Sequence, residues 1–233
     1  MKKILRKLIL FLLFIVICVG AYYTAAGYVM YKKATQNMSV TEKVKEVRTK
    51  DKYVVLDEIP DIYEDAVISA EDHRFYRHRG VDFLSFSRAM IKNIQAGEIL
   101  QGGSTITQQL AKNLFFTHEQ NIERKIAELF VVYQLEDEYA KDVLLELYIN
   151  TVYYGDGYYC IYDAAKGYFD ALPSEMTDYE CTLLAGVPNA PSIYAPTKNQ
   201  HLAQQRQEHV LDRMVECNAL SVEEKQQILQ QRK

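Results

Sequence analysis

Residues 102–116 read GGSTITQQLAKNLFF, the most informative stretch of the chain. Gly102 and Gly103 free the backbone for close approach to a ligand. Ser104 and Thr105 then start a predicted helix, whose unpaired N–H groups favour anions. The polar side chains on its next two turns are Gln108, Gln109, Lys112 and Asn113. They suit a cradle for a sugar diphosphate, and they suit equally well the polar face of an ordinary capped helix.

A pair of acids ends the apolar run that precedes this stretch, where residues 67–80 read VISAEDHRFYRHRG. Glu71 closes a predicted helix and is flanked by Asp72. Partial desolvation by Phe75 and Phe83 would raise the pKa of its carboxyl toward that of a general base. The alternative is a solvated helix end that forms local salt bridges with the arginines that follow.

A second carboxylate lies in ERKIAELF, residues 123–130. Arg124 and Lys125 precede Glu128 by four and three residues, so both cations can keep it ionised. That makes Glu128 a better electrostatic stabiliser than proton acceptor. The alternative is a surface ion pair that contributes little. A helical stripe on the other side of this segment comprises Ile122, Ile126, Leu129, Phe130 and Tyr133.

Residues 141–169 hold seven tyrosines between Tyr148 and Tyr168. Tyrosines can stack on sugars, but a stripe at helical spacing is more often part of the core, and we predict core here. Three polar side chains of the segment are expected to line a cleft, namely Lys141, Glu146 and Asn150.

The N-terminal residues predict a membrane anchor. After basic residues at positions 2, 3, 6 and 7, no charge occurs from Leu8 to Tyr31. About 20 apolar residues cross the hydrocarbon core of a bilayer, so the run is long enough to span it. The basic tip indicates a cytoplasmic N-terminus, a single pass through the plasma membrane and an outer domain beyond it. The alternative, a cleaved signal peptide, is disfavoured by the length of the run.

Charge is divided unevenly along the chain. Residues 1–33 carry six basic and no acidic groups, whereas the rest has 21 basic against 31 acidic groups, a net charge of −10. This balance argues against nucleic acid as a partner. Residues 71–125 differ, with eight basic and six acidic groups, and this cationic island suits an anionic ligand. The cysteines show no CxxC spacing or metal-ligand clustering, so no metal site is predicted.

The expected fold class is mainly α, preceded by a single N-terminal transmembrane helix. Only residues 53–56, YVVL, have the composition of a strand. Capping-box spacings mark three helix starts, at Thr105–Gln108, Thr177–Glu180 and Ser221–Glu224. The expected divisions are tip and anchor at 1–33, a stalk or flexible arm at 34–52, the main domain at 53–200, and a helical tail packed on it at 201–233.

Five stretches, taken in order, resemble the peptidoglycan glycosyltransferases (glycosyltransferase family 51). This family includes the transglycosylase domains of class A penicillin-binding proteins and monofunctional membrane-anchored enzymes. The stretches are EDHRFYRHRG (71–80), GGSTITQQLAKN (102–113), RKIAE (124–128), KDVLLELYIN (141–150) and LLAGVPNAPSIYAP (183–196). The resemblance covers roughly residues 60–197. It implies a lysozyme-like helical domain.

The resemblance also implies a reaction, the polymerisation of lipid II, an undecaprenyl-diphosphate-linked disaccharide-pentapeptide, with inversion at the anomeric carbon. By position, Glu71 is the general base for the acceptor's 4-hydroxyl, and Glu128 is the second essential carboxylate, near the leaving diphosphate. No cofactor is obligatory, and a divalent cation, Mg²⁺ or Mn²⁺, is an optional addition. The implied substrate-binding residues are Asp72, Phe75, His78, Gly103, Ser104, Thr105, Gln108, Gln109, Lys112, Asn113, Arg124, Lys125 and Asn150.

The expected partners are lipid II, the growing glycan chain and the membrane, together with transpeptidases and other proteins of cell-wall synthesis. After about residue 197 only a polar helical tail follows in this sequence. A tail of that size is too short for a transpeptidase domain, so glycan polymerisation without cross-linking is expected.

Two departures from the family pattern concern the donor. Ala127 stands where many members have a lysine, and the loop from Phe116 to Asn121 has no Lys or Arg. Both put donor binding in question more than the class of reaction. Two alternatives stay open: an enzyme that cleaves finished glycan with two carboxylates, and an inactive relative that only scaffolds wall synthesis.

Overall fold

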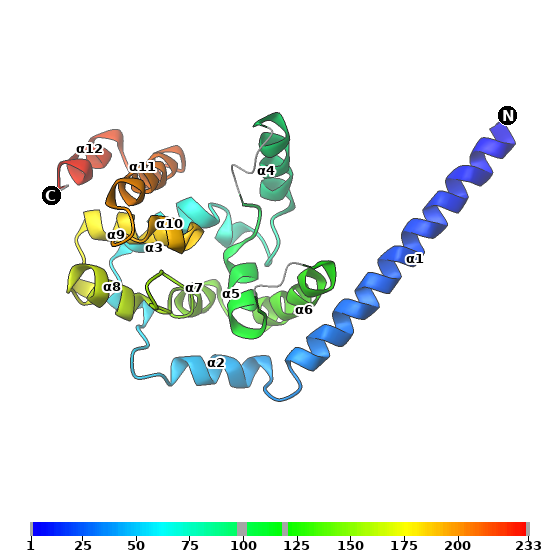
Figure 1. Ribbon diagram of the computed structural model, residues 1–233, viewed down its shortest axis with the longest axis horizontal. Coiled ribbons are helices and arrows are strands. Elements are labelled where there is room, and N and C mark those ends of the chain that lie inside the picture. Colours follow the sequence, from blue (N-terminus) through cyan, green and yellow to red (C-terminus); the bar gives the residue numbers. More distant parts are fainter. Residues whose placement is uncertain (1, 97–101, 118–120, 232–233) are drawn as a thin grey trace.

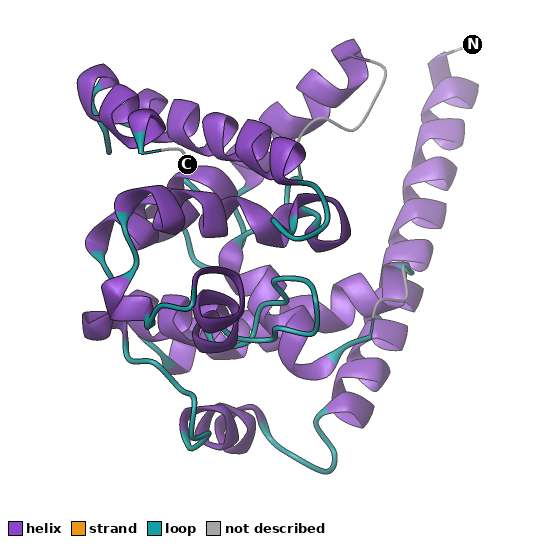
Figure 2. Ribbon diagram, turned by 60° about the vertical axis from the view of Figure 1, so that its left-hand side comes forward, coloured by secondary structure: helices purple, strands orange, loops and turns teal. Residues whose placement is uncertain are grey.

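The computed structural model describes residues 2–96, 102–117 and 121–231, and its regular elements within these ranges are helices (Figures 1 and 2). The prediction of a mainly α fold is therefore confirmed. The α-helices are α1 (Lys2–Ala34), α2 (Val40–Arg48), α3 (Asp61–Glu71), α4 (Phe83–Ala96), α5 (Ile106–Phe115), α6 (Ile122–Glu138), α7 (Lys141–Ile149), α8 (Ile161–Phe169), α9 (Asp178–Gly186), α10 (Pro191–Tyr194), α11 (Gln200–Glu216) and α12 (Val222–Gln230). Short 3₁₀ helices span Leu56–Glu58, Phe75–Arg77, Pro173–Glu175 and Val187–Asn189.

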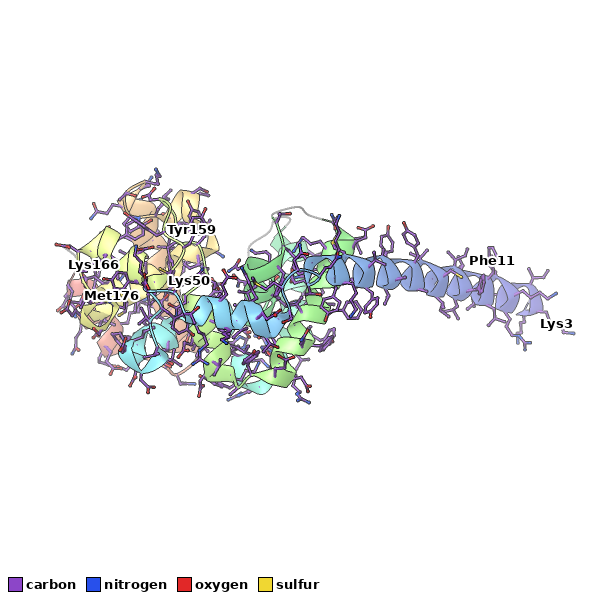
Figure 3. The ribbon with its side chains drawn as sticks, turned by 90° about the horizontal axis from the view of Figure 1, so that it is seen from below. Lys3, Phe11, Lys50, Tyr159, Lys166 and Met176 are labelled. Atoms are coloured by element: carbon purple, nitrogen blue, oxygen red, sulfur yellow. The ribbon has the colours of Figure 1, made fainter. Side chains whose placement is uncertain are left out.

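Helix α1 is long and apolar enough to cross a membrane. Its first two-thirds extend away from the other helices, and side chains around Phe11 radiate on all sides (Figures 1 and 3). Only its last turns, toward Ala34, come close to the rest of the molecule, where they lie against α6. The N-terminal part of α1 thus has the exposed apolar surface expected of an anchor.

Residues 34–52 do not form the expected stalk. Ser39 starts α2 with a complete capping box, in which its hydroxyl accepts from the backbone N–H of Glu42 and the Glu42 carboxylate accepts in return. Val40, Val44 and Val47 lie on one face and are buried in the main core. The prediction of a flexible arm is wrong because these three valines, spaced at helical intervals among charged residues, anchor the segment.

The predicted strand at residues 53–56 is wrong as well. This segment is an extended chain that leads into the 3₁₀ helix Leu56–Glu58. Its backbone bonds with α7 instead of with another strand: the N–H of Val54 donates to Oδ1 of Asn150 at 2.9 Å, and the N–H of Leu56 donates to Oε2 of Glu146 at 3.0 Å. Side chains of α7 thus satisfy the polar groups that a sheet would otherwise pair.

The core brings together helices from both ends of the chain. Helix α3 lies against α9 and α11, while α5 lies against α6 and α7. All three predicted capping boxes form, at the starts of α5, α9 and α12. This arrangement places the C-terminal end of α3, the first turns of α5 and α6, and one face of α11 around a common space.

Candidate active site

Two hollows meet at the C-terminal end of α3. The larger has a volume of about 650 Å³ and the smaller about 300 Å³, and Glu71 lines both. The larger hollow also reaches Glu128, and its other lining residues from α5 and α6 are Gln108, Gln109, Lys112, Ile122, Arg124 and Lys125. The smaller hollow is lined on the α11 side by Arg206, His209, Val210, Asp212, Arg213 and Glu216. A carboxylate placed between two hollows can serve a reacting group in either one.

Glu71 is the last residue of α3, a helix fixed to the core by Tyr63, Ala66 and Val67. Its side chain is only 9% exposed. Oε2 accepts a hydrogen bond from Nε2 of Gln109 at 2.7 Å, whereas Oε1 is buried without a hydrogen-bond partner among the described residues. One oxygen is therefore held in place, and the other has free lone pairs with which to accept a proton.

The amide of Gln109 is itself oriented from α7. Its oxygen accepts from the hydroxyl of Tyr148 at 3.4 Å, which leaves the amide nitrogen to donate to Glu71. Tyr148 is fully buried, and burial raises the pKa of its phenol well above the ordinary value, so the hydroxyl stays neutral. The chain from Tyr148 through Gln109 thus fixes Glu71 from inside the domain.

Helix α11 contributes a cation that the sequence analysis did not single out. Nη2 of Arg206 lies 3.8 Å from Oε1 of Glu71. This distance is too long for a hydrogen bond but short enough to stabilise a negative charge on that oxygen. The guanidinium is placed by a bond from Nε to the carbonyl of Gly186 at 3.4 Å, and it lies 5.9 Å from the ring centre of Tyr194.

A network of buried polar groups ties the loop after Glu71 to the start of α5. Nε2 of His78 lies 2.9 and 3.0 Å from the two oxygens of Asp72. Asp72 also accepts from the backbone N–H of Ile106 at 3.1 Å, and the hydroxyl of Thr105 donates to the carbonyl of Gly80 at 2.6 Å. These bonds hold α3 and α5 in register, and so keep the carboxylate of the first near the amides of the second.

Glu128 belongs to a buried ion pair, whereas the sequence also allowed a surface ion pair at this position. It is 1% exposed, with Oε2 accepting from Nη1 of Arg124 at 2.7 Å and Oε1 accepting from Nζ of Lys125. Lys125 also lies 3.3 Å from the hydroxyl of Ser104, across the larger hollow. Because both oxygens already accept from cations, Glu128 has little capacity to take a proton from a substrate.

A third cation faces the same carboxylate. Burial lowers the pKa of Lys112, and the positive charges of Arg124 and Lys125 lower it further, whereas the carboxylate of Glu128 opposes these effects. Three cations therefore surround one buried carboxylate at this side of the larger hollow. The excess positive charge favours an anionic ligand there.

The structure explains one of the two departures from the family pattern. Ala127 is fully buried and shares the core-facing side of α6 with Val131 and Leu135, at i, i+4 and i+8. At this buried position alanine adds no charge, whereas the ammonium of a lysine would need a partner or a path to water. The second departure is only partly described, since Thr117 and Asn121 line the larger hollow but residues 118–120 lie outside the described residues.

Several predicted substrate-binding residues take structural positions instead. Phe75 and His78 are buried and line neither hollow, and the ammonium of Lys141 lies 4.4 Å from the ring centre of Phe75. Asn150 is corrected too, because its amide is bonded to the backbone of Val54 and of Glu146. The resemblance implied contact of Phe75 and His78 with substrate, and Asn150 was also expected to line a cleft. Sequence patterns do not show which face of each segment turns inward.

The other predicted residues lie as follows. Gly103 lines the smaller hollow, where an added Cβ would come within 2.8 Å of the ring of Phe86. Asn113 lines neither hollow, and its amide nitrogen is buried without a partner among the described residues. Lys141 and Glu146, expected in a cleft, pair instead with Glu136 at 2.8 Å and with the hydroxyl of Tyr53 at 2.5 Å.

One cluster has ligand types that a metal could use. Asp72, His78 and Asp82 offer atoms that lie within 4.8 Å of one another. Asp72 and His78 are bonded to each other, however, and Asp82 accepts from Ser85 at 2.6 Å and lies 3.2 Å from Nε of Arg74. These bonds give the cluster a structural role.

The sequence of this chain is similar to those of known proteins. The family model described as "Transglycosylase" matches residues 26–215. Penicillin-binding protein 1A of Neisseria flavescens is 41% identical over 179 residues, 77% of this chain and 22% of the relative. Penicillin-binding protein 1F of Bacillus subtilis (strain 168) is 42% identical over 171 residues, 73% of this chain and 24% of the relative.

The chain thus spans less than a quarter of the length of these curated relatives. The match to a crystal structure of penicillin-binding protein 1A from Haemophilus influenzae covers 76% of this chain and 17% of the crystallised chain, with 20% identity and a TM-score of 0.42. This structural similarity is too low to add to the sequence match. The family model alone covers most of the chain. By that match, the chain belongs to the transglycosylase family.

Proposed function

We propose that this chain is a peptidoglycan glycosyltransferase that polymerises lipid II into glycan strands. The observation that carries the proposal is that one hollow holds two different buried carboxylates. Glu71 has one oxygen that no described residue hydrogen-bonds, and Glu128 is held by cations on both oxygens. Direct displacement at a sugar needs a base for the nucleophile and positive charge for the leaving group. The two carboxylates supply these two environments.

In the proposed reaction, the 4-hydroxyl of an incoming lipid II lies against Oε1 of Glu71. Its oxygen attacks the anomeric carbon of the growing chain while its proton passes to Glu71. The bond from that carbon to the lipid diphosphate breaks, and the electron pair leaves with the diphosphate, so the anomeric centre inverts. Arg124, Lys125 and Lys112 would stabilise the diphosphate as its negative charge develops.

Glu128 acts in this scheme by keeping the cations in place. Its two oxygens hold Arg124 and Lys125 on one side of the hollow, which orients both for the diphosphate. A divalent cation, Mg²⁺ or Mn²⁺, would add to this charge without being required, and polymerisation measured with and without EDTA tests that part.

The direct test compares purified parent protein with Glu71→Gln on lipid II. Removing the base should lower polymerisation by at least about 10³-fold while thermal unfolding stays unchanged. Asp65→Asn, an exposed acid on the same helix, is the matched control and should polymerise normally. Equal activity of parent and Glu71→Gln would refute the assignment of the base.

The same preparation tests the alternative of glycan cleavage. Incubated with isolated cell wall, the parent protein should release no soluble fragments. Besides a carboxyl that donates a proton, a cleaving enzyme needs a second carboxylate that acts as a nucleophile or activates a water. Both oxygens of Glu128 already accept hydrogen bonds from cations, which disfavours that role. Fragments from cell wall without polymer from lipid II would establish cleavage as the function.

We also propose the setting of the reaction. The basic tip and the apolar helix favour a single-pass protein of the plasma membrane with its catalytic domain outside the cytoplasm. The polymer leaves this site uncross-linked, so its consumer must be an enzyme of the transpeptidase class.

A further inference from the structure

The C-terminal turns of α1 are seated on α6, the helix that carries Glu128 (Figure 1). Gly27 is the buried residue of α1, while the described residues before it are mostly exposed. The contact between these two helices is therefore local to the last two turns of α1.

Gly27 brings the two helices together at backbone distance. A Cβ added at this position would lie 2.5 Å from Cγ2 and 2.7 Å from Cβ of Ile126, and 3.2 Å from the backbone nitrogen of Ala127. Real Cβ atoms do not approach other atoms this closely, so any side chain here would force α1 away from α6. Gly20, one heptad earlier on the same helix, has nothing within 4 Å of its added Cβ.

Aromatic side chains close the contact on the C-terminal side of Gly27. The rings of Tyr28 and Tyr31 lie 5.4 and 5.6 Å from that of Phe130, and the hydroxyl of Tyr31 donates to Oε1 of Gln134 at 3.0 Å. Ile126, Phe130 and Gln134 are spaced i, i+4 and i+8, so they form one face of α6. The apolar stripe predicted for this helix thus includes the seat of the anchor.

The seat lies next to the cations of the site. Ile126 directly follows Lys125 and stands two residues before Glu128, on a helix whose other faces meet the core and the larger hollow. Gly27 also lies five residues before Lys32, where the uncharged run has just ended. At 1.5 Å per residue, that is about 7.5 Å along the helix, so the seat is near the level of the membrane surface.

We propose that α1 is a positioning element of the donor side as well as an anchor. By seating Gly27 on Ile126, it holds Arg124, Lys125 and Glu128 at the height where the diphosphate of a membrane-embedded lipid lies. This inference rests on the proposed function, because it assigns the lipid diphosphate to the larger hollow. It predicts that a defect in the seat weakens use of a bilayer-embedded donor without removing the base.

The test uses full-length Gly27→Leu and Gly20→Leu in vesicles that contain long-chain lipid II. Gly27→Leu should lower polymerisation about tenfold, mainly through a raised KM, whereas Gly20→Leu should stay within about twofold of the parent. Equal rates for Gly27→Leu and the parent would overturn the inference. An inactive parent would instead reject the proposed function, so the two failures are distinguishable.

A donor with a short, water-soluble lipid separates positioning from simple structural damage. Because such a donor is not fixed at the membrane surface, Gly27→Leu should use it nearly as well as the parent does. An equal loss on both donors would show damage to the domain and overturn the inference.

Tyr31→Phe, which loses only the hydrogen bond to Gln134, provides a second variant without overpacking. It should lower use of the long-chain donor by about threefold and leave the soluble donor unaffected, and an unchanged KM would count against positioning.

Discussion

At the residue scale, two glutamates of one hollow differ by what their oxygens contact. Glu71 has one oxygen that accepts from Gln109 and one that has no hydrogen bond from the part of the chain that the structure describes. Both oxygens of Glu128 accept from cations. The first arrangement leaves a proton acceptor, and the second leaves an electrostatic support. The surroundings of each carboxylate therefore support the role that we propose for it.

Replacing Arg206 should slow the reaction. Nη2 of Arg206 lies 3.8 Å from Oε1 of Glu71, and it is the cation of α11 that faces this carboxylate. Arg206→Gln removes that positive charge, so the carboxylate loses an electrostatic contact that holds it in the hollow. We expect kcat/KM on lipid II to fall by about tenfold.

Two further variants test the origin of that loss. Arg206→Lys keeps the charge and should restore most of the parent activity. Arg213→Gln removes a cation of the same helix and hollow that pairs with Glu216, and its activity should match the parent. Unchanged activity in Arg206→Gln would show that this cation has no influence on Glu71.

Glu128→Gln should cost nearly as much activity as Glu71→Gln. Loss of this charge leaves Arg124 and Lys125 without their buried partner, so they repel each other and lose their orientation toward the diphosphate. Steady-state kinetics on lipid II should show kcat reduced by about 10²-fold or more. Glu123→Gln, in the first turn of the same helix, serves as the control, and a similarly small effect in both variants would contradict the proposal.

Sequence patterns were sufficient to single out Glu71, Lys112, Arg124 and Glu128, which the fold brings to one hollow, because each lies in a short distinctive stretch. They were insufficient for Arg206, since its importance depends on α11 returning to the end of α3. They also misplaced Asn150, because a polar residue beside a predicted cleft cannot be distinguished from one that satisfies buried backbone groups. What the sequence could not supply is contact between residues far apart in the chain.

At the element scale, the clearest revision concerns α2. Its charged residues led to the prediction of a flexible arm, although Val40, Val44 and Val47 repeat at helical spacing. The wrong prediction of a strand at 53–56 has a similar cause. The composition of this short run favours a strand, but the sequence does not show that side chains of α7 hydrogen-bond its backbone. In contrast, the capping boxes were predictable because all their atoms lie within four residues.

Val44→Ala should therefore destabilise the protein, which a flexible arm would not allow. The side chain is 3% exposed and lies in the main core, so its loss leaves a cavity worth about 2 kcal/mol. Thermal unfolding of the full chain in detergent should show a Tm lower by several degrees. Lys45→Ala, an exposed neighbour on the same helix, should leave Tm unchanged, and equal Tm values for both variants would indicate that α2 is detached.

At the scale of the whole molecule, the fold separates charges that the sequence mixes. Lys112, Arg124 and Lys125 line the larger hollow, and Arg88 and Arg206 line the smaller one. Acids from three elements converge elsewhere, around Glu64 near the start of α3, where Asp57, Asp61, Asp65 and Asp142 act on it together. Sequence composition alone predicted a local cationic segment, but not this compact acidic cluster, because Asp142 reaches it only through the packing of α7.

This acidic cluster should make stability depend on pH. Partial burial, followed by the charges of Asp61, Asp142, Asp65 and Asp57, raises the pKa of Glu64 to about 7. A raised pKa means that the folded protein holds this proton more tightly than the unfolded chain. The stabilising contribution is therefore complete below about pH 4.5 and is lost as the pH rises toward 7.

Glu64→Gln removes the charge that forms above pH 7 and should raise Tm there. Because the side chain is partly exposed, solvent screens much of the repulsion, and we expect a gain of about 2 °C at pH 8. At about pH 3.5 the glutamate is mostly neutral in both the folded and the unfolded state, so the variant and the parent should unfold at the same temperature. Asp137→Asn, an exposed acid on α6, should change Tm at neither pH. A gain of equal size at both pH values would show that Glu64→Gln acts through packing and not through the repulsion among these acids.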